Sequence, residues 1–254
     1  MTVLTPYNIF IADTENKLWA VMKDGRVVFI KKISSFACLS ADFKSFSTVS
    51  FDGERTSLFL QDFSCDEGGS LLFKQWGYWY YPSFFQKGKS KLLAVIKADL
   101  LNPKGTGDLI IFQKKRTQFH PLIQLKASVK PLQWDLKTGD LYYISAKKAL
   151  VRTDGKHGEI LSADSDLFAL SYDGTHIAFY HNDTIHVLSL QTGSLETFYA
   201  FDVKTLTFSA DGKGVYFSSS KENKFNLYLL DRATGEVNLV FSHAFEIIFL
   251  SPAI

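Results

Sequence analysis

The chain has few of the residues that would mark a disulfide-rich, membrane-spanning or nucleic-acid-binding protein. Its 254 residues include two cysteines, Cys38 and Cys65, which are far apart and lie in no CxxC pattern. We therefore expect two separate reduced thiols. No apolar run approaches the roughly 18 residues that a membrane span needs. The net charge is +2, with acidic and basic residues interspersed, so we expect no nucleic acid as a partner.

The N-terminal residues show no basic region followed by an apolar core, which is the pattern of a secretory signal. Together with the unpaired cysteines, this predicts a cytoplasmic location. A periplasmic location would follow instead if a signal peptide has been removed.

The motifs of common nucleotide-binding and nucleophilic sites are incomplete or missing. Gly88-Lys89-Ser90 resembles the end of a P-loop, but the first glycine of that motif would fall on Ser83. The residues after Ser90 read as a strand, whereas a P-loop needs a helix N-terminus there. No Gly-x-Ser-x-Gly elbow is present. We therefore predict no catalytic residues.

Two weak metal-site patterns occur. His181, Asp183 and His186 flank one expected hairpin, but a zinc site needs further ligands held by partners of their own. The acidic loop with Asp62, Asp66 and Glu67 lacks the ligand spacing of a calcium loop. We interpret both as solvated surface and predict no metal and no cofactor.

Aromatic residues are abundant, with 23 Phe and 11 Tyr, and they favour strands. The phrase Ser-x-Asp-Gly occurs three times, at 50–53, 171–174 and 209–212, each time between two apolar runs. The last two copies are about 40 residues apart and the first lies about three such steps upstream. A period of this size with a turn between strand-like runs is typical of a β-propeller blade.

We therefore predict an all-β chain, a six-bladed β-propeller of four-stranded antiparallel blades in a single domain, 1–254. The N-terminal region offers three strands and the C-terminus one, so both ends are expected to complete one blade, which removes exposed sheet edges. Five or seven blades are the alternatives. The expected blades are 245–254 with 5–33, 43–80, 81–125, 128–163, 165–200 and 203–243.

These repeats resemble the WD-like propeller repeats of the TolB type, whose first strand ends in Ser-x-Asp-Gly. The resemblance places the chain among a family that includes periplasmic scaffold proteins and the propeller domains attached to some serine peptidases. An active site is needed once, whereas a hairpin is needed in every blade. We therefore interpret the aspartates and glycines of the phrase as structural turns: Asp52, Gly53, Asp173, Gly174, Asp211 and Gly212.

A partner protein is expected at the face where the innermost strands begin. Aligning the blades puts six residues of mixed type at this face, which suits a heterogeneous protein surface: Ser45, Tyr81, Lys130, Asp166, Lys204 and Glu246. The long loops Asp62–Gly69 and Ala98–Gly107 are expected beside them, which adds Asp66, Glu67 and Lys104 to the candidate contacts. The aromatic stretch 76–81 is either a binding hot spot or a packed strand.

Two functions follow. The first is a non-catalytic protein–protein interaction module: an adaptor, an assembly subunit or a neutralising partner of another protein. The alternative is a small-molecule hydrolase or lyase with its site in the central funnel. The expected inner positions carry mostly Phe, Thr, Leu and Ser, which favours the first.

Overall fold

The computed structural model describes residues 7–32, 35–39, 45–62, 70–87, 90–99, 105–115, 118–221 and 224–252. Within these residues the chain forms 24 strands in six four-stranded antiparallel sheets, which we number 1 to 6. None of the described residues forms a helix that is long and apolar enough to cross a bilayer. The predicted all-β class with six four-stranded antiparallel blades is confirmed, and the alternatives of five or seven blades are wrong.

The strands divide between two compact units. Unit 1, Met1–Ile33 with Asp166–Ile254, contains sheets 1, 5 and 6. Sheet 1 has the order β24 (Ile247–Pro252), β1 (Tyr7–Asp13), β2 (Lys17–Met22), β3 (Val27–Lys32); sheet 5 comprises β16 (Leu167–Leu170), β17 (His176–His181), β18 (Thr184–Ser189) and β19 (Leu195–Tyr199); sheet 6 comprises β20 (Val203–Phe208), β21 (Gly214–Lys221), β22 (Lys224–Asp231) and β23 (Val237–His243).

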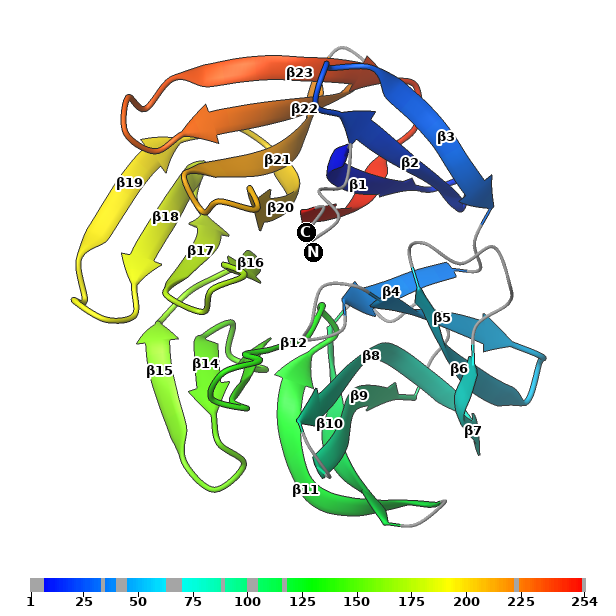
Figure 1. The fold of residues 1–254 in the computed structure, drawn as a ribbon. Helices are drawn as coiled ribbons and strands as arrows, with labels where there is room; N and C mark the ends of the chain where they lie inside the picture. Colours follow the sequence, from blue (N-terminus) through cyan, green and yellow to red (C-terminus); the bar gives the residue numbers. More distant parts are fainter. Residues whose placement is uncertain are drawn as a thin grey trace. The chain divides into compact units, whose positions relative to one another are not determined.

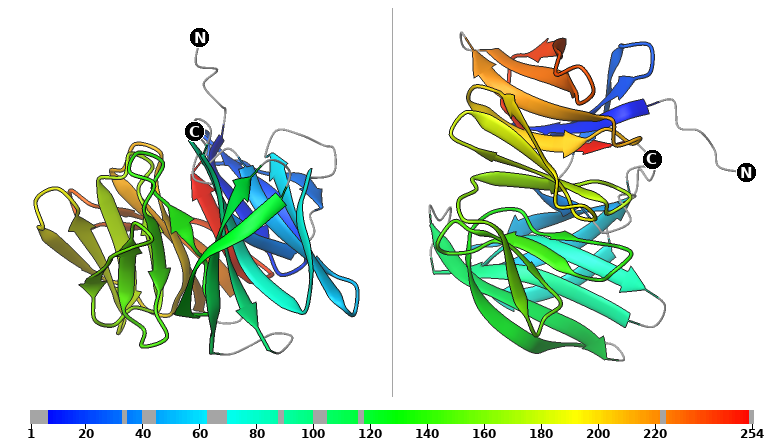
Figure 2. Two further views of the ribbon diagram at one scale, coloured as in Figure 1. Left: turned by 90° about the horizontal axis from the view of Figure 1, so that it is seen from below. Right: turned by 90° about the vertical axis from the view of Figure 1, so that its left-hand side faces the viewer.

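Both ends of the chain contribute to sheet 1. β24 pairs antiparallel with β1, with Phe10 opposite Ser251 and Ile11 opposite Leu250. The red and dark-blue strands lie side by side in Figure 1 and again in both views of Figure 2. The predicted closure of one blade by the two terminal segments is therefore confirmed.

Unit 2, Ser34–Ser165, contains sheets 2, 3 and 4. Sheet 2 comprises β4 (Ser35–Leu39), β5 (Ser45–Phe51), β6 (Arg55–Asp62) and β7 (Ser70–Trp76); sheet 3 comprises β8 (Tyr78–Lys87), β9 (Ser90–Ala98), β10 (Thr106–Lys115) and β11 (Gln118–Ser128); sheet 4 comprises β12 (Gln133–Trp134), β13 (Leu141–Ile144), β14 (Leu150–Thr153) and β15 (Gly158–Ser162).

The sheets that we expected at 43–80 and 81–125 begin elsewhere. Sheet 2 starts at Ser35, because β4 precedes the run that was interpreted as its first strand. Sheet 3 starts at Tyr78, directly after Gly77, which has a φ of +87° and turns the chain out of β7. β8 continues past Tyr81, at a φ of +49°, through an irregularity between Tyr80 and Ser83.

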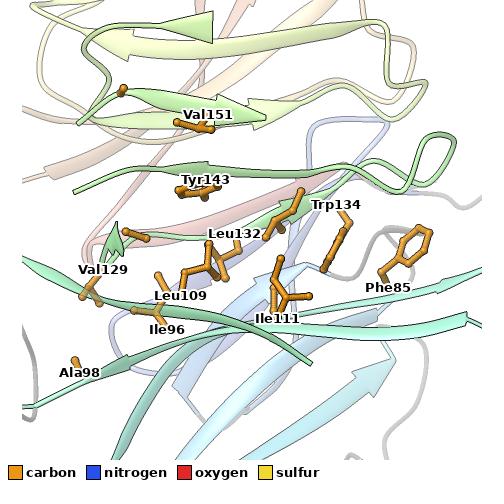
Figure 3. Close-up of a cluster of buried hydrophobic side chains, with 14 residues drawn as sticks. Phe85, Ile96, Ala98, Leu109, Ile111, Val129, Leu132, Trp134, Tyr143 and Val151 are labelled. Carbon is orange, nitrogen blue, oxygen red and sulfur yellow. The ribbon is translucent and has the colours of Figure 1, made fainter. Parts of the chain in front are cut away.

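Alternating residues of neighbouring strands build the core of each unit. Between sheets 3 and 4 the alternation brings Ile96, Leu109 and Ile111 against Tyr143 and Val151. Figure 3 shows these side chains converging, with Leu132 among them and with Trp134 and Phe85 at one end of the cluster. In unit 1, sheet 6 packs on sheet 5 through one cluster and on sheet 1 through another. Fully burying one such large apolar side chain contributes about 1.5–3 kcal/mol.

Candidate protein-binding surface

Each sheet has one end at which its innermost strand begins. We call these innermost strands, one in each sheet, the leading strands: β24, β4, β8, β12, β16 and β20. The leading end of a sheet is the end at which its leading strand begins. The opposite end is the trailing end. Asp166 and Glu246 directly precede β16 and β24, Lys204 is the second residue of β20, and Lys130 precedes β12. These four predicted contact residues lie at the leading ends of their sheets, and none is buried.

Two predicted contact residues are placed differently. Ser45 starts β5, the second strand of sheet 2, where it pairs with Asp62, so it lies at the trailing end. The reason is that β4 precedes it. Tyr81 lies inside β8 at the irregularity rather than at the start of the strand.

The two long loops that were expected on one face leave opposite ends of their sheets. β6 ends at Asp62 beside Ser45, so the connection that begins there leaves the trailing end of sheet 2. β9 ends at Ala98 opposite Tyr78, so the next connection leaves the leading end of sheet 3, as expected. Asp66, Glu67 and Lys104 lie outside the described residues.

The three copies of Ser-x-Asp-Gly form two kinds of turn. The copies at 171–174 and 209–212 join the first and second strands of sheets 5 and 6. In the last copy the Ser209 hydroxyl donates to Asp211 Oδ1 at 2.7 Å and accepts from the Gly214 amide at 2.9 Å. Gly174 and Gly212 have φ angles of +67° and +71°, which glycine adopts readily.

The copy at 50–53 ends the second strand of sheet 2, not the first. Asp52 Oδ1 accepts from the amides of Glu54 and Arg55 at 3.2 and 2.7 Å, while Ser50 is exposed in the ladder opposite Ser57. These bonds and Lys74, 3.1 Å away, lower the pKa of Asp52 to about 2. The expectation that the phrase always ends the innermost strand is therefore wrong for this copy.

The histidines near one hairpin of sheet 5 contact protein groups. His181 Nδ1 lies 3.6 Å from Asp166 Oδ2, and Asp183 accepts the Tyr180 hydroxyl at 2.9 Å. The His186 ring stacks on Phe179 with centroids 4.9 Å apart, and burial lowers its pKa. Across the described part of the chain, no three or more His, Cys, Asp or Glu side chains are grouped so that they could hold a metal ion.

A buried carboxylate network at the leading end of sheet 1 was not anticipated. Asp13, with no exposed surface, accepts from Trp19 Nε1 at 2.9 Å and from His243 Nε2 at 3.0 Å. The amides of Glu15 and Lys17 donate to its other oxygen, each at 3.0 Å. Burial alone would raise the pKa of Asp13, but these four hydrogen bonds outweigh it and hold the pKa below its usual value.

This network resembles a catalytic Asp–His pair in composition only. The carboxylate already has four donors and is fully covered, and His243 is also enclosed by the rings of Trp19, Phe241 and Phe245, whose centroids lie 5.4–5.8 Å away. A reacting group would have to displace one of these partners. We interpret the network as a structural joint between β23 and sheet 1.

Exposed aromatic side chains gather at the leading ends. Six aromatic residues of the described chain are exposed: Phe29, Trp76, Tyr172, Tyr199, Phe201 and Phe245. Four of them lie at leading ends, since Trp76 ends β7, Tyr199 ends β19, and Phe201 and Phe245 precede β20 and β24. Tyr172 alone of the six lies in a turn at a trailing end, and Phe29 lies within β3.

In unit 2 the exposed aromatic is Trp76, with 57% of its surface accessible. The guanidinium of Arg55 lies 4.4 Å from the centre of its ring, and the Trp76 carbonyl accepts from Trp79 Nε1 at 2.9 Å. Trp79 itself is buried against Phe73 and Phe112. The aromatic stretch 76–81 thus divides between an exposed end and a packed strand.

In unit 1 two of the exposed aromatic residues, Phe201 and Phe245, lie in a short sequence pattern that occurs twice and that the sequence analysis did not use. Ala200-Phe201-Asp202-Val203 and Ala244-Phe245-Glu246-Ile247 lead into β20 and β24. Val203 and Ile247 are buried while the two phenylalanines are 61% and 37% exposed. Their recurrence in the sequence was the signal available for finding them.

Comparison with solved structures identifies the arrangement of these sheets. TolB from Acinetobacter baumannii matches 97% of this chain with a TM-score of 0.66 and 18% identity. A chain of a nidogen–laminin complex matches 97% of this chain and 98% of its own length, with a TM-score of 0.71 and 13% identity. The fold is a six-bladed β-propeller. It is the TolB-like propeller fold that the repeats led us to expect, although this chain spans only 64% of the length of TolB.

An oligogalacturonate lyase in complex with manganese matches 87% of this chain and 69% of its own length, with a TM-score of 0.53 and 12% identity. No protein-family model and no curated protein sequence matches the chain. At these identities the likeness concerns the fold, so function has to be argued from the surface residues.

Proposed function

We propose that the protein is a non-catalytic protein–protein interaction module that binds its partner through the leading ends of its sheets. Such a module could act as an adaptor, an assembly subunit or a neutralising partner of another protein. The observation that carries the proposal is the concentration of exposed aromatic side chains at these ends. Trp76 lies there in unit 2, and Tyr199, Phe201 and Phe245 lie there in unit 1.

Aromatic side chains supply a large contact area at a small cost in conformational entropy, and Trp and Tyr are enriched among residues that dominate binding energy. Exposed singly, such residues need no explanation, but within unit 1 three of them, Tyr199, Phe201 and Phe245, lie at leading ends, which supports an interaction site there. The buried Asp13–His243 pair supports the same conclusion. It has the composition of a catalytic Asp–His pair, but its hydrogen bonds hold β23 against sheet 1.

Affinity capture from an extract of the native host, read by quantitative mass spectrometry, tests the proposal. We expect one stoichiometric partner, with recovery reduced at least tenfold by Trp76→Ala or by Tyr199→Ala combined with Phe201→Ala. Tyr172→Ala is the matched control, because it removes an exposed aromatic side chain from the trailing end. Recovery that depends on Tyr172 and not on the leading-end residues would overturn the proposal.

A small-molecule hydrolase or lyase is the second candidate, because one solved structure with this fold is a lyase in complex with manganese. It requires a bound metal or convergent acid and base groups. Metal analysis of the purified protein, together with turnover assays on lactones and oligogalacturonate, separates the candidates. A stoichiometric metal with measurable turnover would favour the enzyme.

A further inference from the structure

Tyr199 and Phe201 form the most exposed aromatic pair at a leading end of unit 1, with 74% and 61% of their surfaces accessible. They flank the buried Ala200 on the connection from β19 to β20 (Figure 1). Among the described residues no other aromatic ring and no Lys or Arg side chain stacks on either of these two rings. We call Tyr199 and Phe201, with the carboxylates of Asp166, Asp183 and Asp202, the sheet 5 surface.

The backbone of the connection that carries Tyr199 and Phe201 is fixed by hydrogen bonds to sheet 5 and to sheet 6. The Ala200 amide donates to the Asp183 carbonyl at 2.9 Å, and the Ser219 hydroxyl of β21 donates to the Phe201 carbonyl at 2.7 Å. Ala200 and Val203 are buried in the cluster between sheets 5 and 6. The two aromatic side chains are therefore presented by an anchored connection, so little ordering is needed when a partner binds.

The charged side chains around the pair are mainly acidic. Residues 166–202 contain five acidic side chains and neither Lys nor Arg. Asp166 precedes β16, Asp183 lies in the turn from β17 to β18, and Asp202 precedes β20, so all three lie at the leading end. Lys204 pairs with Asp202 at 2.5 Å and partly offsets this charge.

The Trp76 ring in unit 2 provides a contrast. Its face already holds a cation of the same chain, the Arg55 guanidinium at 4.4 Å. The rings of Tyr199 and Phe201 offer the same kind of face, and within the described part of the chain no Lys or Arg side chain lies against them. A guanidinium can stack on an aromatic ring and pair with a carboxylate at the same time, and Arg does so better than Lys.

We propose that the sheet 5 surface binds a basic segment of a partner protein, one whose Arg or Lys side chains stack on Tyr199 and Phe201 and pair with Asp166, Asp183 and Asp202. This inference rests on the proposed function and adds the chemistry of the partner. Opposite charges across an interface increase the rate of encounter and exclude acidic competitors.

A random 12-residue peptide library displayed on phage and selected on the whole protein tests the inference. We expect enriched peptides rich in Arg and Lys, and fluorescence polarisation should then give weaker binding as salt is raised. Tyr199→Ala with Phe201→Ala should weaken binding at least tenfold, and so should Asp166→Asn, Asp183→Asn and Asp202→Asn combined. Asp183 and Asp202 have φ angles of +55° and +51°, which Asn tolerates.

The matched control carries Asp173→Asn, Asp211→Asn and Asp231→Asn. It removes the same charge from the trailing ends of sheets 5 and 6, where these side chains accept backbone hydrogen bonds that an Asn oxygen can also accept. We expect less than a twofold change in peptide binding.

The outcomes separate this inference from the proposed function. Acidic or purely apolar peptides that depend on Tyr199 and Phe201 but not on the carboxylates would overturn the basic partner and leave the interaction module standing. Basic peptides whose binding is unchanged by both the Tyr199→Ala, Phe201→Ala variant and the triple Asp→Asn variant would also overturn the inference. So would the absence of any enrichment. The affinity capture described above then decides separately whether the protein binds a partner.

Discussion

Asp13 and Asp52 both lie where the second strand of a sheet turns into the third, yet their surroundings differ. Asp13 ends the second strand of its sheet and Asp52 directly follows the second strand of its own, and each accepts two backbone amides. Asp13 is fully buried and also accepts from Trp19 and His243, whereas half of the Asp52 side chain is exposed and its partner is Lys74. A turn aspartate therefore matters to the fold according to what else its carboxylate joins.

One of the two side-chain partners of Asp13 comes from a distant part of the chain. Trp19 follows six residues later in β2, but His243 ends β23 of sheet 6, 230 residues away. The carboxylate therefore links sheet 6 to sheet 1, close to the point where β24 pairs with β1. The carboxylate of Asp52 joins only its own turn and the neighbouring β7.

The largest effect is expected from Asp13→Ala. It leaves the Trp19 and His243 donors and the partly buried amides of Glu15 and Lys17 without their acceptor, so we expect a loss of about 3 kcal/mol in the free energy of unfolding. Urea denaturation monitored by Trp fluorescence measures it. Asp52→Ala is the matched control at the corresponding turn. Equal losses in the two variants would show that the turn, and not the buried network, carries the energy.

The second effect concerns the Asp13–His243 contact itself. A double-mutant cycle with Asp13→Asn and His243→Ala should give a coupling energy of about 1–2 kcal/mol, because the two side chains share one buried network. The cycle of Asp52→Asn with Lys74→Ala, an exposed pair at 3.1 Å, should give a clearly smaller value. A coupling near zero for Asp13 and His243 would mean that burial alone makes the site important.

The third effect is the dependence of stability on pH. The pKa of Asp13 in the folded protein lies below the value of 3.8 expected for an unperturbed carboxyl. The ionised form therefore contributes stability that is fully present above about pH 4 and is lost as the pH falls through the folded pKa. We expect the difference in urea midpoint between the wild type and Asp13→Asn to shrink on acidification below about pH 4.

Using the difference between two proteins cancels the acid titration of other groups, among them Asp52 and Asp154, whose pKa values are both about 2. A midpoint difference that stayed constant from neutral pH down to acid unfolding would contradict the assignment of a low pKa to Asp13.

The sequence could predict the sheets that local signals delimit. Alternating apolar runs and Asp-Gly or Thr-Gly turns place the strands of sheets 4, 5 and 6, and the shortage of strands at each terminus indicates a shared blade. Sheets 2 and 3 were misplaced because the phrase at Ser50 looks like the two later copies while it ends a second strand. A tetrapeptide specifies a turn, but it does not specify whether the strand before it is the first or the second strand of its sheet.

The candidate surface could be predicted only in part. The positions of Asp166, Lys204 and Glu246 at leading ends could be predicted, because the strands that begin beside them have clear sequence signals. Tyr199 was missed because exposure in a strand depends on which of two alternating positions faces the core, and that follows from packing between sheets. Phe201 lies in the repeated Ala-Phe-acidic pattern, which the prediction did not use. The Asp13–His243 contact carries no local signal, since its partners are 230 residues apart.

The smallest effect tests the phrase itself. Asp211→Ala removes an acceptor of the Ser209 hydroxyl and the Lys213 amide, so we expect a loss of about 1 kcal/mol and no change in partner binding. Asp52→Ala should cost less, because the side chain of Ser50 takes no part in the turn, whereas Ser209 bonds to Asp211 and to the Gly214 amide. Thermal unfolding of the two variants in parallel measures the difference. If Asp52→Ala were the more damaging, the serine would not be what distinguishes the two turns, and the Asp-Gly pair alone would account for all three copies.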